Sequence, residues 1–386
     1  MSSSSLAPAR LVARTEPIDP PVDLLDELGP EGFAWLAPDA SFVTSGVVAS
    51  LAPEEAAAWL RAVAHVRDAS VPFDVGPRAC GALPFGGRGR LVVPESLVIQ
   101  DADGAFWRTT IAADDAPSMR LVPTQPTRFA VSAATSRDDW CESVREALDA
   151  INAGHLTKVV LARAVDVTAD EPFDPRAVLR QLVRTQPGCI TFAADGFVGA
   201  TPELLVRKHG ADVMSRPLAG TGTDVDALKE STKDSHEHQL VVDAVARALG
   251  SLSHDLNIDG PRAIAFADVA HLATTISASV DADISVIDLV DRLHPTPAVG
   301  GTPSRAAVEF IARHERDGRG RYAGPCGWTN ADGDGEFVVA LRCAQLDGVT
   351  ARLHAGAGIV AGSDPDSEWA ETQQKFEPML RALVRP

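Results

Sequence analysis

Residues 322–355 read YAGPCGWTNADGDGEFVVALRCAQLDGVTARLHA, and this segment carries the clearest structural pattern in the chain. It holds three apolar runs, separated by short turns rich in Asp, Asn and Gly, at residues 322–329, 336–344 and 349–355. Runs of this length with such turns predict β-strands. Parallel strands need a crossover of a dozen residues or more, so the short turns predict an antiparallel sheet.

The first of these turns, NADGDG at residues 330–335, resembles the start of a calcium-binding loop. Position twelve of such a loop would be Leu341, where a bidentate glutamate is needed. We therefore interpret the segment as a hairpin turn.

Outward from this segment, strand and helix patterns alternate in groups. Strand patterns, including a hairpin around the turn at 101–104, are found at residues 90–111, 158–167, 190–207 and 263–280. Helix patterns are found at residues 53–67, from the Ser136–Asp139 capping box to before Gly154, around Glu237, and from Thr302-Pro303 to before Gly318. This order predicts an α+β fold of large antiparallel β-sheets with helices packed outside, in a single interwoven domain. Within it we expect a disordered leader at residues 1–20, a variable N-terminal part at 21–130 and a catalytic region at 131–386.

Composition excludes several classes of partner and location. The 386 residues are 45% hydrophobic, enough for a large core, and the net charge of −18 argues against a nucleic acid or an anionic membrane as partner. No apolar run reaches the roughly 18 residues of a membrane span. The five cysteines are scattered and form no CxxC pair, which favours a reducing, cytoplasmic location.

Two predicted helices carry acidic groups where apolar ones are expected. In residues 233–250, Glu237 lies at helical spacing with Val241 and Ala244 on the apolar face, where an unpaired charge would be costly. Near the C-terminus, Glu368, Glu371 and Lys375 share one side of a second helix. Two buried acidic faces suggest a shared cation, and a few oxygen ligands suit Mg²⁺ better than zinc.

Two further residues are candidates for proton transfer. Lys158 begins a strand and shares a face with small, apolar residues, so burial would make it a usable base near neutrality. The alternative is a strand-end lysine that reaches water.

Glu203 follows a proline and precedes two leucines, and desolvation there would suit a proton donor. The alternative is a solvent-facing strand residue. His236 and His238 point to different sides of their helix, and we interpret both as surface residues.

Taken together, these segments resemble the chorismate-utilising enzymes, and within that family the isochorismate synthases of menaquinone and siderophore synthesis. The resemblance spans residues 136–384, whereas the first ~130 residues match only loosely. The matching blocks occur in the family's order: LTKVVLARAV (156–165), TPELLV (201–206), RPLAGT (216–221), KDSHEHQLV (233–241), HLATT (271–275), LHPTPAVGGTP (293–303), RYAGPCGW (321–328), VVALRCAQ (338–345), HAGAGIV (354–360) and SEWAETQQK (367–375).

The resemblance implies a role for each matched residue. Lys158 matches the general base that activates water to attack C2 of chorismate, and Glu203 the general acid that protonates the departing C4 hydroxyl. Glu237 and Glu371 match the Mg²⁺ ligands, with Glu368 nearby. The remaining matches are to substrate-binding positions, at Gly220, Thr221, His271, Ala298, Arg342, Gly356 and Lys375.

Subfamily signals imply water as the nucleophile. Ammonia-using relatives lack a lysine at the place of Lys158, so no glutaminase subunit is expected, and we expect a monomer that takes chorismate as substrate. Thr221 is shared with salicylate synthases, which go on to eliminate pyruvate, and that activity is the alternative. The LHPTPA block favours the isochorismate synthases.

Overall fold

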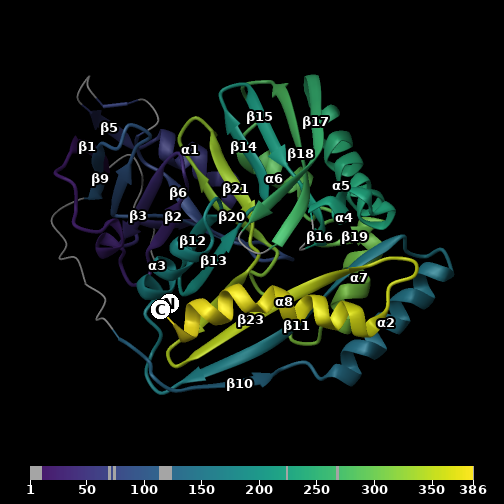
Figure 1. Cartoon of the computed structure of the whole chain (residues 1–386). Helices are drawn as coiled ribbons and strands as arrows, with labels where there is room; N and C mark the ends of the chain where they lie inside the picture. The colour runs from purple at the N-terminus through teal and green to yellow at the C-terminus, as the bar shows by residue number, and fades with distance from the viewer. Residues whose placement is uncertain are drawn as a thin grey trace.

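A computed structural model describes residues 11–67, 71–72, 75–112, 124–222, 225–266 and 269–385. Two large β-sheets dominate this part of the chain, and helices cover their outer faces (Figure 1). All strand pairs described are antiparallel except β1 with β5. The predicted α+β class with large antiparallel sheets is confirmed.

The first sheet holds both the N-terminal strands and the strands that carry several candidate residues. Its order is β10 (Phe129–Ala133), β11 (Lys158–Ala169), β23 (Thr350–Ile359), β22 (Cys343–Asp347), β13 (Phe197–Thr201), β12 (Ile190–Ala194), β2 (Phe33–Leu36), β3 (Ser41–Ser45), β8 (Ser96–Gln100), β9 (Phe106–Ala112), β1 (Val12–Pro17) and β5 (Ala64–Arg67), with β19 (Gly301–Thr302) paired to β11.

The second sheet is likewise built from both ends of the chain. Its order is β16 (Leu218–Gly222), β18 (Val269–Val280), β15 (Asp212–Arg216), β14 (Leu204–His209), β21 (Gly335–Val339), β20 (Pro325–Thr329), β6 (Ala79–Ala82), β7 (Leu91–Val93) and β4 (Ala49–Leu51), with β17 (Ser253–Phe266) paired to β18. Because both sheets contain N-terminal and C-terminal strands, the chain forms one interwoven unit.

The helices begin where the sequence provides caps. Ser136 accepts a hydrogen bond from the Asp139 backbone N–H, as predicted, and Asp364 accepts one from Ser367. The helices are α1 (Ala56–Arg61), α2 (Arg137–Asn152), α3 (Pro175–Thr185), α4 (Val225–Glu230), α5 (Thr232–Gly250), α6 (Val286–Leu293), α7 (Ser304–His314) and α8 (Pro365–Val384). α8 lies across β11 and β23 (Figure 1).

The strand predicted at residues 336–344 is in fact two strands in different sheets. β21 ends at Val339, and β22 begins at Cys343. Between them Arg342 has φ +46°, a left-handed conformation that is unusual for a residue other than glycine. The chain crosses here from the second sheet to the first, which the continuous apolar pattern concealed.

Two N-terminal predictions are wrong in part. Residues 12–17 of the expected loose leader form β1, which pairs with both β5 and β9, while residues 1–10 lie outside the described residues. The helix predicted at 53–67 ends at Arg61 in α1, and residues 64–67 form β5 instead. Pairing with β1 outweighs the helical pattern of this short segment.

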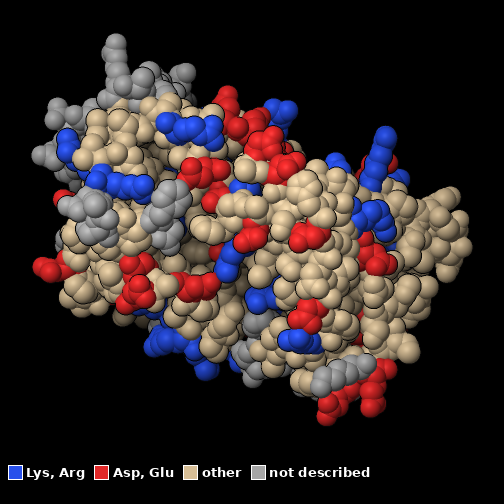
Figure 2. Space-filling model, turned by 90° about the horizontal axis from the view of Figure 1, so that it is seen from above, with Lys and Arg blue, Asp and Glu red and all other residues tan. Residues whose placement is uncertain are grey.

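Charged side chains of both signs are interspersed on the face shown in Figure 2, with no continuous basic patch among the described residues seen there. That face therefore offers no broad attraction for a polyanion. Over the residues that the structure describes, every helix is too short or too polar to span a lipid bilayer.

We expect Gly301→Ala to destabilise the protein strongly, because β19 passes tightly against the start of β11. An added Cβ would lie 2.7 Å from Ala307 Cβ and 2.9 Å from Val159 Cα, and would meet the Lys158 carbonyl oxygen. The expected loss in the free energy of unfolding is about 2–4 kcal/mol. Gly318→Ala is the control, since Gly318 also has positive φ but open space around it, and it should lose only about 1 kcal/mol. Equal losses in a urea titration would contradict the steric argument.

Candidate active site

A cavity of about 140 Å³ lies where the two sheets approach each other beneath α5 and α8. Its wall is formed by the connection between β13 and β14, by β16, β18 and β23, and by the crossing at Arg342. Of the predicted site residues, the following line it: Glu203, Gly220, Glu237, His271, Ala298, Arg342, Gly356, Glu371 and Lys375. Segments from residue 203 to residue 375 are therefore brought together, as the hypothesis requires.

Lys158 lies directly behind this wall. Its side chain is fully buried, and its Nζ donates to Glu237 Oε1 at 2.7 Å. Glu237 itself is half-buried and lines the cavity. The predicted strand-end alternative, a lysine that reaches water, is wrong, because the Lys158 side chain is fully buried.

The second lysine is held at the opposite side by α8 and β23. Lys375 Nζ donates to Glu371 Oε1 at 2.6 Å and to the Gly356 carbonyl at 2.9 Å. Both side chains remain about one-third exposed, so this pair is more open to water than the Lys158–Glu237 pair.

Arg342 is positioned by a histidine rather than by a carboxylate. Its Nη2 donates to His271 Nε2 at 2.8 Å, and His271 Nδ1 lies 3.0 Å from the Gly220 carbonyl oxygen. A guanidinium only donates and a carbonyl only accepts, so the imidazole must be neutral with its proton on Nδ1. Burial, reinforced by the charge of Arg342, lowers the pKa of His271 to about 3, which agrees with this tautomer.

Glu203 is almost completely buried, with 3% of its surface exposed. Burial raises its pKa from 4.5 to about 8, although the nearby charges of Lys158 and Lys375 act in the opposite direction. The carboxyl group is therefore protonated at neutral pH. The solvent-facing alternative for Glu203 is wrong.

Two glycines allow the side chains of Glu237, Lys158 and Asp234 to lie close to the backbone. A Cβ at Gly358 would lie 2.7 Å from Glu237 Oε1 and 3.1 Å from Lys158 Cε. At Gly220, which has φ +69°, a Cβ would lie 2.9 Å from Asp234 Cβ. A side chain at either position would displace a carboxylate that lines the cavity.

Some predictions find no support in this geometry, and some residues were missed. Glu368 is buried but does not line this cavity, and the side chain of Thr221 lies outside the described residues. His238 is buried, with Nε2 2.7 Å from Thr274 Oγ1, so the surface prediction for it is wrong. The missed wall residues include Asp234, Tyr322 and His354. Asp234 lies one helical turn before Glu237, and this spacing could have identified it.

The residues present fit Mg²⁺ bound together with a substrate. Glu237 and Glu371 supply carboxylate oxygens to the same cavity. In the described part of the chain, no three His, Cys, Asp or Glu side chains gather closely enough to hold a metal by themselves. Mg²⁺ commonly takes only one or two protein carboxylates and completes its shell with water and substrate oxygens, so this donor set suits it.

The chain is similar to proteins of one enzyme family. A family model described as chorismate binding enzyme matches residues 95–384. The chain belongs to the chorismate-binding enzyme family. The putative isochorismate synthase MenF of Mycobacterium tuberculosis is 41% identical over 334 residues, which cover 80% of this chain and 86% of that protein. Isochorismate synthase EntC of Escherichia coli is 34% identical over 382 residues, or 92% and 95% of the two chains.

A solved structure extends the likeness within the chorismate-binding family to the whole fold. The structure of MenF, the menaquinone-specific isochorismate synthase from Escherichia coli, matches with a TM-score of 0.83 at 28% identity. The match covers 97% of this chain and 94% of that one. It includes the N-terminal strands, which the sequence alone related to the family only loosely.

We expect Glu237→Ala to cost about 3 kcal/mol in the free energy of unfolding, because it leaves the fully buried Lys158 ammonium without its carboxylate. Glu371→Ala should cost less than about 1 kcal/mol, since the Glu371–Lys375 pair is partly exposed. Urea titrations in EDTA would measure both. Glu237→Gln keeps an acceptor for Lys158 and should fall between them. A loss for Glu371→Ala as large as that for Glu237→Ala would contradict this account.

Proposed function

We propose that this protein is a Mg²⁺-dependent isochorismate synthase, which adds water at C2 of chorismate and releases the C4 hydroxyl. Family membership and the named relatives support the reaction class. The observation that carries the proposal is Glu203, a carboxylic acid kept protonated at neutral pH in a cavity lined by two cationic side chains, with Lys158 bonded to a third lining residue. The site pairs an acid with a candidate base.

Glu203 is the proton donor in this mechanism. A hydroxyl is a poor leaving group unless it is protonated as it departs, and a buried acid with a pKa near 8 can supply that proton at pH 7. In the reverse direction the same carboxylate takes the proton back.

We assign the base to Lys158: its ammonium, which pairs with Glu237 in this structure, must first release a proton, and the neutral amine then takes one from the attacking water. Its side chain is fully buried and is bonded to Glu237, which lines the cavity. Loss of this ion pair, when the Glu237 carboxylate takes up another partner, would favour the neutral amine.

The charge of the cavity supports the proposed divalent ion. The cations Lys158, Arg342 and Lys375 are matched by three carboxylates, at Asp234, Glu237 and Glu371, while Glu203 and His271 are neutral at pH 7. Chorismate carries two carboxylates, so its binding adds two uncompensated negative charges. Mg²⁺ held by Glu237 and Glu371 would supply the balancing charge, and Arg342 and Lys375 would hold the carboxylates.

Incubating the purified protein with chorismate and Mg²⁺ tests the function. Chromatography should show a persistent mixture of chorismate and isochorismate, since the two are close in energy, and excess EDTA should abolish turnover until Mg²⁺ is restored. Lys158→Ala should lose about 10²- to 10⁴-fold in rate. Stoichiometric pyruvate release would instead indicate salicylate synthase, and full activity in metal-stripped protein would overturn the role of Mg²⁺.

The pH profile tests Glu203 separately. The raised pKa means that the acid form is present below about pH 8 and is lost above it, so the forward rate should fall as the pH rises through that value. Glu203→Gln should remove this descending limb and slow both directions about 10²- to 10⁴-fold. The measurement is the initial rate between pH 6 and 10. A limb that persists in Glu203→Gln would assign it to another group.

A further inference from the structure

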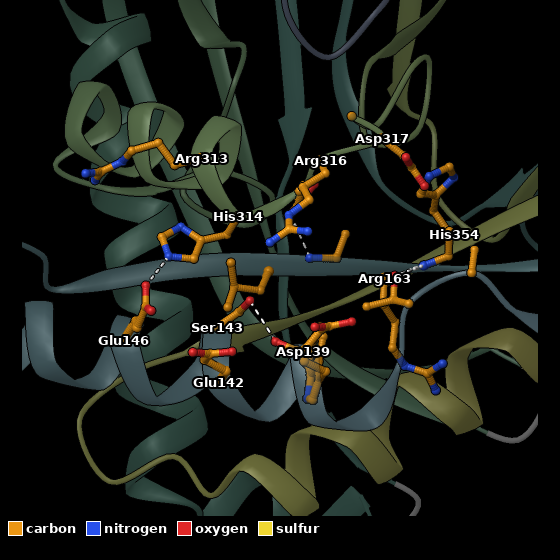
Figure 3. A pocket seen from close by; sticks show the side chains of 18 residues that line it. Asp139, Glu142, Ser143, Glu146, Arg163, Arg313, His314, Arg316, Asp317 and His354 are labelled. Carbon is orange, nitrogen blue, oxygen red and sulfur yellow. Dashed lines mark hydrogen bonds and ion pairs between the residues drawn. The ribbon is translucent and has the colours of Figure 1, made fainter.

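A second cavity, of about 440 Å³, lies between α2 and the loop that follows α7, over strand β11 (Figure 3). Its floor includes Leu161, Ala162 and Ala164, on the part of β11 that extends between its pairings with β19 and β10. None of the residues that carry the proposed reaction lines it. Of the residues that the structure describes, His354 alone lines both cavities.

The edge of β11 is open at this cavity. β19 pairs with residues 158–159 and β10 with residues 165–169, so the peptides between them face no strand on that side. Side chains replace the missing strand: Glu315 accepts from Ala162 N–H at 2.8 Å, and Arg319 donates to the Val160 carbonyl at 2.6 Å. The Ala162 carbonyl points the same way as its N–H. No hydrogen bond reaches this carbonyl from the described residues.

The wall formed by α2 is acidic, whereas the loop wall carries charges of both signs. On the loop wall, Glu315 is paired with Arg319, Asp317 with Arg352, and Arg313 donates to the Glu309 carbonyl. Asp139, Glu142 and Glu146 rise from α2, while Arg316 reaches toward β11 from the loop after α7 (Figure 3). Asp139 is bonded to Ser136 at 2.7 Å, and Glu146 lies 2.6 Å from His314. Within the described part of the chain, Glu142 and Arg316 form neither an ion pair nor a hydrogen bond. One free carboxylate thus faces one free guanidinium across the cavity.

We propose that this cavity binds a zwitterionic small molecule of amino-acid size, with its ammonium group at Glu142 and the Ala162 carbonyl and its carboxylate at Arg316. A polyanion would meet the acidic wall, and a polyamine would meet Arg316. The carboxylates do not form a group able to hold a metal ion alone. A molecule with both charges satisfies the free acid, the free base and the open carbonyl together.

The site lies close to the parts that hold the catalytic groups in place. Arg163, which also lines the second cavity, donates to Thr372 and Gln373 of α8 at 2.7 and 2.6 Å. α8 carries Glu371 and Lys375. On the other side, the His354 ring stacks on Tyr322 at 5.4 Å, and Tyr322 lines the catalytic cavity. A bound molecule would therefore contact both supports of the catalytic site.

Calorimetric titration of the full chain with each of the twenty proteinogenic L-amino acids, without chorismate, tests this site directly. At least one should bind with a Kd of about 1 mM or tighter, and the amine and the carboxylic acid that each keep only one of its charges should bind at least about tenfold more weakly. Glu142→Gln and Arg316→Gln should each weaken binding about tenfold or more, while their turnover of chorismate stays at the wild-type level. This outcome does not depend on whether the proposed reaction is correct.

Matched variants make the result decisive. Asp138→Asn on α2 and Arg305→Gln on α7 change exposed charges outside the cavity and should leave binding unchanged. Absence of binding by every amino acid at about 20 mM would overturn the proposal. So would equal binding of the singly charged analogues, or binding lost in Arg342→Gln but retained in Arg316→Gln, which would place the molecule in the catalytic cavity.

Discussion

The buried ion pair between Lys158 and Glu237 is the contact on which the arrangement of the site depends. Lys158 begins β11 in the first sheet, and Glu237 lies on α5, which packs against the second sheet. A fully buried ammonium is strongly unfavourable without a partner, so the pair restricts how the two sheets can sit relative to each other. It also places the candidate base and a candidate metal ligand in direct contact. Movement of one side chain therefore alters the environment of the other.

The backbone crossing at Arg342 also links the two sheets at the site. The chain leaves the second sheet at Val339, adopts a left-handed conformation at Arg342 and enters the first sheet at Cys343. Such a conformation costs free energy for a residue with a Cβ and is common at functional sites. Here it directs the guanidinium to His271 on β18. The residue that we propose to hold a substrate carboxylate thus lies at the junction of both sheets.

Sequence patterns were sufficient where the deciding interactions are local. The Ser136 cap, the β8–β9 hairpin and the acidic face of α5 depend on residues a few positions apart, and the structure confirms each. Patterns failed where partners distant in the sequence determine the secondary structure or the sheet of a segment. Residues 64–67 pair with β1, and the apolar run 336–344 is divided between the two sheets. His238 was misplaced because its partner, Thr274, lies on a strand 36 positions away. That all these segments meet in one cavity was implied only by the family resemblance.

The protonation states of the cavity explain how an acidic protein can accommodate an acidic substrate. His271 holds Arg342 without cancelling its charge, because a neutral imidazole accepts the hydrogen bond that a carboxylate would otherwise take. Among the described residues, no carboxylate pairs with Arg342, whereas Lys158 and Lys375 each have one. Glu203 contributes no negative charge while it is protonated. The neutral Glu203 removes a negative charge from the cavity, and the neutral His271 holds Arg342 without adding one, so the charge of Arg342 stays available to an incoming dianion.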